Sequence, residues 1–221
     1  MPVIRFDNVS LVLNRTAILE NINFHVGKGE YVLLFGTSGA GKSSILRLIH
    51  GDILPTVGTV TVRDTDTRGL KRSRLAHHRR SVGFIFQDYK LIPNMTAYEN
   101  VAFALEVTGQ KRRSIRQKAI QALNTVGLGH RLQHYPHDLS GGECQRVAIA
   151  RAIVLEPFIL LADEPTGNLD DENAWAIVKL LNTINHAGTA VLMATHKPTF
   201  TRRLNARILT LHHGRLTSCM P

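Results

Sequence analysis

A glycine-rich octapeptide between two apolar segments constrains the fold of this chain more than any other feature. Residues 36–43 read Gly-Thr-Ser-Gly-Ala-Gly-Lys-Ser and match the pattern G-x-x-x-x-G-K-[ST] in full. Residues 31–35 before it are a continuous apolar run, short enough to be a strand buried on both faces. Residues 43–50 after it carry apolar side chains at helical spacing, and Gly51 follows as a stop signal. The sequence therefore predicts a strand, a glycine-rich turn and a helix.

This octapeptide has the chemistry of a phosphate site. Glycines let the backbone wrap around a phosphate with its N–H groups pointing inward, and the start of a helix adds partial positive charge. Lys42 supplies a mobile positive charge for terminal phosphates, and the Ser43 hydroxyl can ligate Mg²⁺. The predicted nucleotide-binding residues of this segment are Gly36, Thr37, Ser38, Gly39, Ala40, Gly41, Lys42, Ser43 and Ser44.

Two acids follow another apolar run and supply a second part of the site. Residues 158–162 are apolar, and Asp163 and Glu164 come directly after them. Ligands of open α/β sheets bind at the carboxyl ends of the strands, so we expect both acids beside the phosphate. We assign Asp163, with Ser43, to Mg²⁺, and Glu164 to the general base that activates an attacking water.

A third motif at residues 139–145, Leu-Ser-Gly-Gly-Glu-Cys-Gln, opens a helix with a hydroxyl and two glycines. Such a helix start is a second anion-binding terminus. One nucleotide does not need two termini from distant parts of one small domain, whereas two chains arranged head to tail would use both. The alternative is an ordinary capped helix without a ligand.

Composition narrows the class without deciding it. The chain has 27 Lys and Arg against 17 Asp and Glu, a formal charge of +10. Nucleic acid, an anionic membrane surface and phosphate-rich ligands all fit this charge, as does a solvated basic surface. Apolar runs are far shorter than the roughly 20 residues of a membrane-spanning helix, so we expect no span. Two cysteines cannot form a disulfide framework, and a reducing compartment is the default expectation.

Strand and helix patterns alternate along the chain, which predicts a largely parallel sheet covered on both faces. Residues 3–10 and 18–26 read as half-buried strands, and residues 96–137 as a helical insertion. With these motifs in this order, the whole chain resembles the nucleotide-binding subunit of ATP-binding cassette (ABC) proteins. The resemblance implies a P-loop NTPase of α/β class with a mostly parallel core sheet, an N-terminal antiparallel β subdomain and a helical insertion.

The resemblance also implies roles for particular residues, with ATP and Mg²⁺ as cofactors. In the family, the residue corresponding to Gln87 touches Mg²⁺ and the attacking water, and that corresponding to His196 contacts the γ-phosphate. Two chains form a homodimer on ATP binding, and a loop with Asn168 and Asp170 crosses the interface. The signature residues act on the nucleotide of the partner chain, and here they are Ser140, Gly141, Gly142 and Glu143.

The implied organisation is one domain over residues 1–221. Residues 1–94 and 138–221 form the RecA-like core with the β subdomain, and residues 95–137 form a helical subdomain.

Narrower stretches resemble the ABC ATPases of bacterial cell division, at residues 86–94, 96–101, 163–170 and 191–196. That resemblance implies an FtsX-like integral membrane partner, contact with the cell-division machinery, a peripheral place on the cytoplasmic face of the inner membrane, and control of septal peptidoglycan hydrolysis. No direct nucleic-acid partner is expected. ATPases of lipoprotein-releasing or macrolide-efflux transporters are the alternative. A repair-type nucleic-acid ATPase is disfavoured, because no long heptad run separates the motifs.

Three residues depart from the family pattern. Cys144 stands in the signature where glutamine is usual, which we interpret as a tolerated small residue rather than a redox site. Lys197 follows His196 where an acid is frequent, and it either adds charge near the phosphates or is solvated. The third residue is Leu13.

The basic residues around 68–80 and 112–118 form either a solvated face or a contact with anionic lipid head groups, and we favour the contact.

The third departure, Leu13, generates a prediction. It stands where an aromatic residue usually stacks on adenine, and such stacking contributes about 1–3 kcal/mol per base. Leucine still offers apolar contact, so we expect a loss near the lower end of this range and looser base selectivity, with comparable rates of GTP and ATP hydrolysis. Steady-state kinetics with both nucleotides measures this. A strict preference for ATP that Leu13→Tyr leaves unchanged would contradict it.

Overall fold

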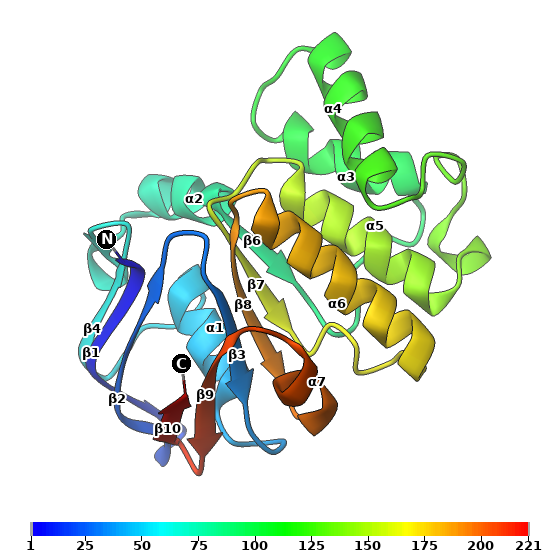
Figure 1. The fold of residues 1–221 in the computed structure, drawn as a ribbon. Coiled ribbons are helices and arrows are strands. Elements are labelled where there is room, and N and C mark those ends of the chain that lie inside the picture. Colours follow the sequence, from blue (N-terminus) through cyan, green and yellow to red (C-terminus); the bar gives the residue numbers. More distant parts are fainter. Residues whose placement is uncertain (1, 221) are drawn as a thin grey trace.

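The computed structural model of the chain describes residues 2–220, without the side chains of residues 202 and 218–220. Two sheets organise it (Figure 1). The antiparallel sheet has the order β2-β1-β4-β5, with strands β1 (Pro2–Leu13), β2 (Thr16–Gly27), β4 (Val57–Val62) and β5 (Thr65–Asp66). The core sheet has the order β10-β9-β3-β8-β7-β6, with strands β3 (Tyr31–Phe35), β6 (Val82–Ile85), β7 (Ile159–Asp163), β8 (Ala190–Thr195), β9 (Arg207–His212) and β10 (Arg215–Met220).

The core sheet is parallel except at its edge, where β10 pairs antiparallel with β9. Helices cover it as the alternation predicted. They are α1 (Lys42–His50), α2 (Arg72–Ser81), α3 (Ala97–Glu106), α4 (Arg112–Thr125), α5 (Gly141–Ile153), α6 (Asp171–His186) and α7 (Pro198–Arg203), with short 3₁₀ turns at Thr67–Gly69 and Pro136–Asp138.

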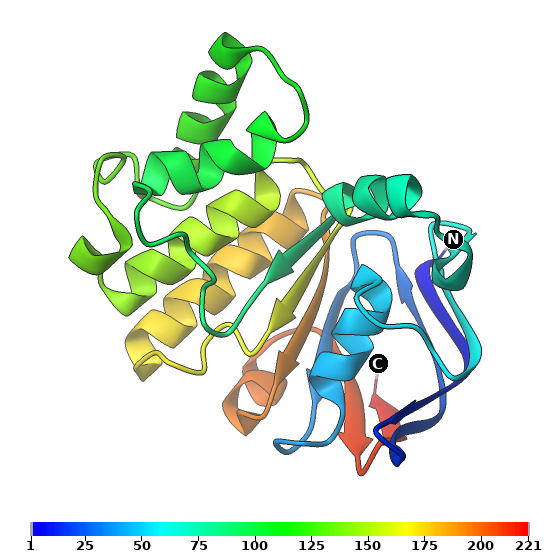
Figure 2. The same ribbon diagram turned by 180° about the vertical axis from the view of Figure 1, so that it is seen from behind.

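Alternate residues of the central strands feed two apolar cores. Val32 and Leu34 of β3 pack with α1 and the antiparallel sheet, while Leu33 between them packs in the core of α3 to α6. Figure 2 shows α1 on the face that carries the antiparallel sheet. Because both faces of the strands are buried, their sequences are continuous apolar runs.

Side chains cap the starts of three helices that carry predicted site residues or neighbour them. Thr96 and Ser140 form capping boxes at the starts of α3 and α5, and Asp170 caps α6. By contrast, Lys71 and Lys111 stand at the uncapped starts of α2 and α4. Helices α3 and α4 pack on α5 and project beyond the sheet (Figure 1).

The structure adds elements that the sequence analysis did not predict. The segment expected to be helical over residues 96–137 consists of α3, α4 and a loop that ends in a 3₁₀ turn. Strand β10 and helix α7 were missed, because each is only six residues long and neither has a strong apolar period. Among the described residues, no helix is long and apolar enough to span a membrane.

Phe200 gives a test of the packing that holds α7 against the sheet. Its ring is 1% exposed and meets Trp175 edge to face, with 5.2 Å between ring centroids. We expect Phe200→Ala to lower the free energy of unfolding by about 3–5 kcal/mol, the range for a buried aromatic truncated to alanine. Urea denaturation measures this. Val107→Ala is the control, because Val107 is 54% exposed, and a loss as large there would contradict the assignment.

Candidate active site

The phosphate loop joins β3 to α1 and requires glycine at both of its ends. A Cβ on Gly36 would lie 2.4 Å from the carbonyl oxygen of Leu211, so no larger residue fits there. Gly41 has a φ of 106°, a conformation that side chains disfavour, and it is the N-cap of α1. The loop is also tied to the β9–β10 hairpin, where the Gly214 N–H donates to the Ala40 carbonyl at 3.1 Å.

Lys42 occupies the centre of this loop. Its Nζ donates to the carbonyl oxygens of Gly36 at 2.8 Å and Thr37 at 2.9 Å. The same ammonium pairs with Glu164 Oε1 at 3.1 Å, and the side chain is only 5% exposed. A buried ammonium is tolerated when it is paired and hydrogen-bonded in this way. The predicted phosphate-binding cation and the predicted general base are therefore in direct contact.

Asp163 and Glu164 point to different partners although they are adjacent. Asp163 ends β7 and accepts a hydrogen bond from Ser43 Oγ at 3.0 Å. Glu164 has a φ of 45°, and its Oε2 lies 2.6 Å from His196 Nδ1. Burial is the main cause that raises the pKa of Asp163, and the neighbouring charge of Glu164 raises it further. The predicted metal ligand pair and the predicted pair of base and histidine thus form from adjacent residues at one strand end.

Gln87 lies next to the predicted interface loop. Its carbonyl accepts from Asn168 Nδ2 at 3.2 Å, and its side-chain amide lies 3.1 Å from where a Cβ on Gly167 would stand. Gln87 is exposed, and within residues 2–220 no hydrogen bond joins its amide to the Lys42–Glu164 pair. Leu13 ends β1 and is partly buried against the core that contains α1.

The signature segment forms a capped helix start. Ser140 Oγ accepts from the Glu143 N–H at 3.3 Å, and Glu143 Oε2 accepts from the Ser140 N–H at 2.9 Å. Gly142 faces Asn173, since a Cβ there would lie 2.7 Å from Asn173 Oδ1. Asp170 accepts from the backbone and side-chain nitrogens of Asn173. The signature and the predicted interface loop are therefore neighbours.

The signature lies well apart from the phosphate loop of the same chain. Figures 1 and 2 show the starts of α1 and α5 on different sides of the core sheet. This separation agrees with the prediction that the signature serves a nucleotide bound by another copy.

The structure shows the surroundings of Cys144 and Lys197, two of the residues that depart from the family pattern. The Cys144 thiol is buried, donates to the Pro136 carbonyl at 3.4 Å, and has a pKa raised by that burial. A protonated thiol is a weak nucleophile, so its environment favours a packing role over a redox role. Lys197 is not simply solvated, because its Nζ donates to the Thr166 carbonyl at 3.4 Å, beside the Glu164 turn.

Two residues with site contacts were missed by sequence reasoning. Arg151 of α5 and Asn100 of α3 bond to backbone carbonyls of the segment that follows Gln87. A polar side chain within a helix has no distinctive sequence pattern. Only complete burial, 0% exposure for Asn100, marks it in the structure.

Comparison with known proteins agrees with this geometry. The family model of the ABC transporter domain matches residues 19–167, more than half of the chain. The cell division ATP-binding protein FtsE of Escherichia coli K12 is 44% identical over 97% of both chains. FtsE of Mycobacterium tuberculosis is 46% identical over 90% of this chain and 86% of its own length.

Solved structures give the same result. The ATP-binding cassette MJ0796, in a dimeric post-hydrolysis state with ADP and phosphate, superposes with a TM-score of 0.87 at 34% identity over 98% of this chain and 97% of its own. CbiO1 of Clostridium perfringens superposes with a TM-score of 0.92 at 27% identity, over 99% of this chain and 88% of its own. The fold and site define a nucleotide-binding ATPase, and the chain belongs to the ABC transporter family. Within that family it is similar to the FtsE proteins over nearly its whole length.

The raised pKa of Asp163 predicts how this carboxylate affects stability. A buried acid whose folded pKa exceeds its unfolded value stabilises the fold when protonated, and that contribution is lost as pH rises through the folded pKa. We therefore expect Asp163→Asn to raise the melting temperature of the nucleotide-free chain at neutral pH. The gain should shrink towards about pH 4, near the unfolded pKa of aspartate. Thermal denaturation across pH checks this, and a melting temperature lowered at neutral pH would contradict it.

Proposed function

We propose that this chain is the ATP-binding and hydrolysing subunit of an FtsEX-like membrane complex in bacterial cell division. The observation that carries the proposal is its 44% identity to FtsE over 97% of both chains. The contact of Lys42 with Glu164 on the phosphate loop supplies matching chemistry. In this proposal, hydrolysis drives a shape change in an FtsX-like integral membrane partner, which regulates septal peptidoglycan hydrolysis.

The residues present fit Mg²⁺ with a nucleotide. Ser43 and Asp163 place a hydroxyl and a carboxylate oxygen 3.0 Å apart, and Mg²⁺ prefers oxygen ligands of this kind. In the part of the chain that the structure describes, no three His, Cys, Asp or Glu side chains form a closed metal site. Phosphate and water oxygens would therefore complete the shell with Ser43, Asp163 and Gln87. The bound ion would neutralise charge on the phosphates.

Hydrolysis follows from an exchange of partners at Lys42. Its Nζ bonds to two loop carbonyls and to Glu164. A triphosphate offers more negative charge than these carbonyls, so Lys42 turns to the phosphates and leaves Glu164 free. Glu164 then accepts a proton from the attacking water. His196 Nδ1, 2.6 Å from Glu164 Oε2, holds the carboxylate in place. Its imidazole would contact the γ-phosphate of a bound ATP.

A second copy completes each nucleotide site in this proposal. Ser140, Gly141, Gly142 and Glu143 of one protomer cover the nucleotide held by the phosphate loop of the other. Asn168 and Asp170 line the interface beside them. The dimeric state of MJ0796 with ADP and phosphate supports this arrangement.

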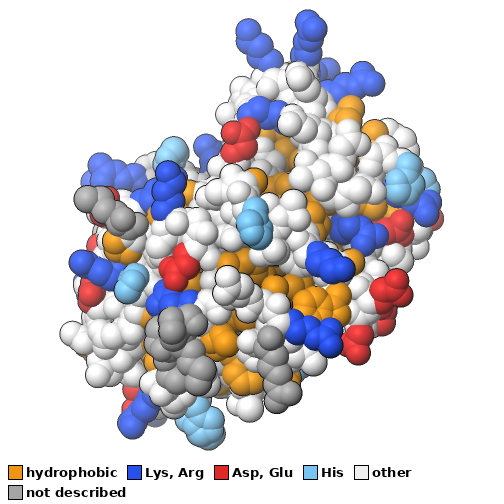
Figure 3. Space-filling view, in the orientation of Figure 1, with side chains coloured by type: hydrophobic (Ala, Val, Ile, Leu, Met, Phe, Trp, Pro, Cys, Tyr) orange, Lys and Arg blue, Asp and Glu red, His pale blue; other side chains and the backbone are white. Residues whose placement is uncertain are grey.

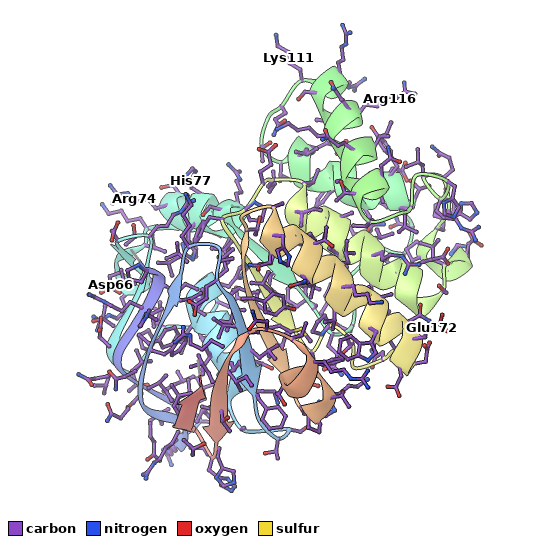
Figure 4. The ribbon with its side chains drawn as sticks, viewed as in Figure 1. Asp66, Arg74, His77, Lys111, Arg116 and Glu172 are labelled. Carbon is purple, nitrogen blue, oxygen red and sulfur yellow. The ribbon has the colours of Figure 1, made fainter. Side chains whose placement is uncertain are left out.

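The proposed place of the chain is the cytoplasmic face of the inner membrane, reached through the partner. Exposed basic side chains support contact with anionic lipids. Figure 4 shows Arg74 and His77 on α2, and Lys111 and Arg116 at α4, pointing away from the body of the protein. Figure 3 shows the Lys and Arg side chains at this edge.

We also propose the division of the chain into a core (residues 1–94 and 138–221) and a helical subdomain (residues 95–137), since α3 and α4 project from the sheet.

Copurification with the membrane partner tests the biological role. An FtsX-like protein should be recovered from detergent extracts of the native membrane. A lipoprotein-releasing or macrolide-efflux permease in its place would instead favour the transporter alternative.

Glu164→Gln tests the catalytic assignment. The amide keeps the shape of the side chain but cannot accept the proton of water, so we expect ATP binding and dimerisation to persist. Turnover should fall by about 10²–10⁴-fold, the usual contribution of a general base. Gel filtration with ATP and a phosphate-release assay measure the two properties. Turnover at the wild-type rate would contradict the role of Glu164.

A further inference from the structure

The segment that joins β6 to α3, which Figure 2 shows, contains a turn with two residues of positive φ. Tyr89 and Lys90 have φ values of 59° and 49°, in the left-handed region that non-glycine residues rarely adopt. Such conformations persist only where the surroundings enforce them. This turn lies two residues after Gln87, so whatever enforces it also sets the path of the backbone that carries Gln87.

Arg151 of α5 enforces the turn. Its Nη1 donates to the Lys90 carbonyl at 2.6 Å, and its Nη2 donates to the Tyr89 carbonyl at 2.7 Å. The planar fork of a guanidinium places one nitrogen on each of two neighbouring acceptors, and the single nitrogen of an ammonium cannot do this. Within residues 2–220, no carboxylate forms an ion pair with Arg151. Its described hydrogen bonds therefore go to the backbone of this turn.

The same segment contacts the start of α5. A Cβ on Gly141 would lie 3.0 Å from the Tyr89 hydroxyl, so the Tyr89 side chain reaches the signature. Helix α5 therefore holds the turn through Arg151 and meets its side chain at Gly141.

The remainder of the segment is fixed to α3. Asn100 Nδ2 donates to the carbonyls of Ile92, Met95 and Thr96, and Asn100 Oδ1 accepts from the Ile92 N–H. Asn100 is fully buried, so these bonds are shielded from water. Hydrogen bonds thus join the segment both to α5 and to α3.

We propose that Arg151 is a positioning residue that sets Gln87 through the Tyr89–Lys90 turn and so links two nucleotide sites. Gln87 serves the nucleotide of its own protomer, whereas Ser140 and Gly142, on the same α5, serve that of the partner protomer. Closure of the signature onto one nucleotide then moves Gln87 toward the other. This inference rests on the proposed dimeric ATPase.

Arg151→Lys in the full-length chain tests the proposal. Lysine keeps the charge but has a single donor nitrogen, so it cannot reproduce the two bonds that Nη1 and Nη2 of Arg151 make to Lys90 and Tyr89. We expect kcat for ATP to fall about tenfold, because misplacing a catalytic group by about 1 Å can cost up to a hundredfold. KM should change less than about twofold, since the phosphate loop is untouched, and the Hill coefficient should fall to about 1. An unchanged kcat, or equal Hill coefficients in both proteins, overturns the proposal.

A double-variant cycle separates positioning from general damage. If Arg151 acts through Gln87, Arg151→Lys should lower kcat less than about twofold in a Gln87→Ala background. If the losses in kcat of the two single variants multiply in the double variant, the proposal is overturned. Arg5→Lys is the control, because Arg5 also makes a guanidinium contact, with Asp7 at 2.8 Å, but on β1 and not in this segment. Its kinetics should match the wild type.

Hydrogen exchange provides a readout that does not depend on turnover. In Arg151→Lys, residues 86–92 should exchange faster while β7 and β8 stay protected, and faster exchange throughout the chain overturns the proposal. Should the variant not fold, the wild type suffices. A non-hydrolysed ATP analogue should then protect residues 86–92 and the first turn of α5 together, and protection of only one overturns it. A wild type without ATPase activity would instead refute the proposed function.

Discussion

The buried ammonium of Lys42 is the interaction on which the site depends. Its Nζ contacts three oxygens from two segments of the sequence: the carbonyls of Gly36 and Thr37 on the phosphate loop, and the carboxylate of Glu164. Burial of this charge is tolerated only while those oxygens stay in place. The strand ends that carry them are fixed by the parallel pairing of β3, β8 and β7. The sheet therefore determines the distance between the phosphate loop and the Glu164 carboxylate.

The site also depends on helix α5. Its N-terminus carries the signature, and its last turns carry Arg151, which holds the strained turn after Gln87. A rigid helix moves as one body, so the signature and the turn that Arg151 holds cannot move independently. Asn100 extends the same constraint to α3. The projecting helices are thus mechanically connected to the nucleotide site rather than appended to it.

Much of the fold and site was predictable because it rests on local chemistry. The glycine pattern at residues 36–43 predicted a strand–turn–helix unit, and Gly36 and Gly41 have the close contact and positive φ that such a loop requires. Apolar runs predicted strands buried on both faces. The weak periods of β10 and α7 did not suffice: β10 is placed by its pairing with β9, and Phe200 of α7 is buried against Trp175 of α6.

The sequence by itself determined which residue types are suited to bind a phosphate, in which order they follow the strands, and that the chain is of the ABC class. Each of these is written in short motifs whose chemistry is local. The tertiary structure decided that Glu164 faces Lys42 and His196 while Asp163 faces Ser43, and that Arg151 holds the turn after Gln87. These pairings join residues up to 122 positions apart, as in Lys42 with Glu164. Only the packed sheet and helices bring such groups within hydrogen-bond distance, and no local pattern records that.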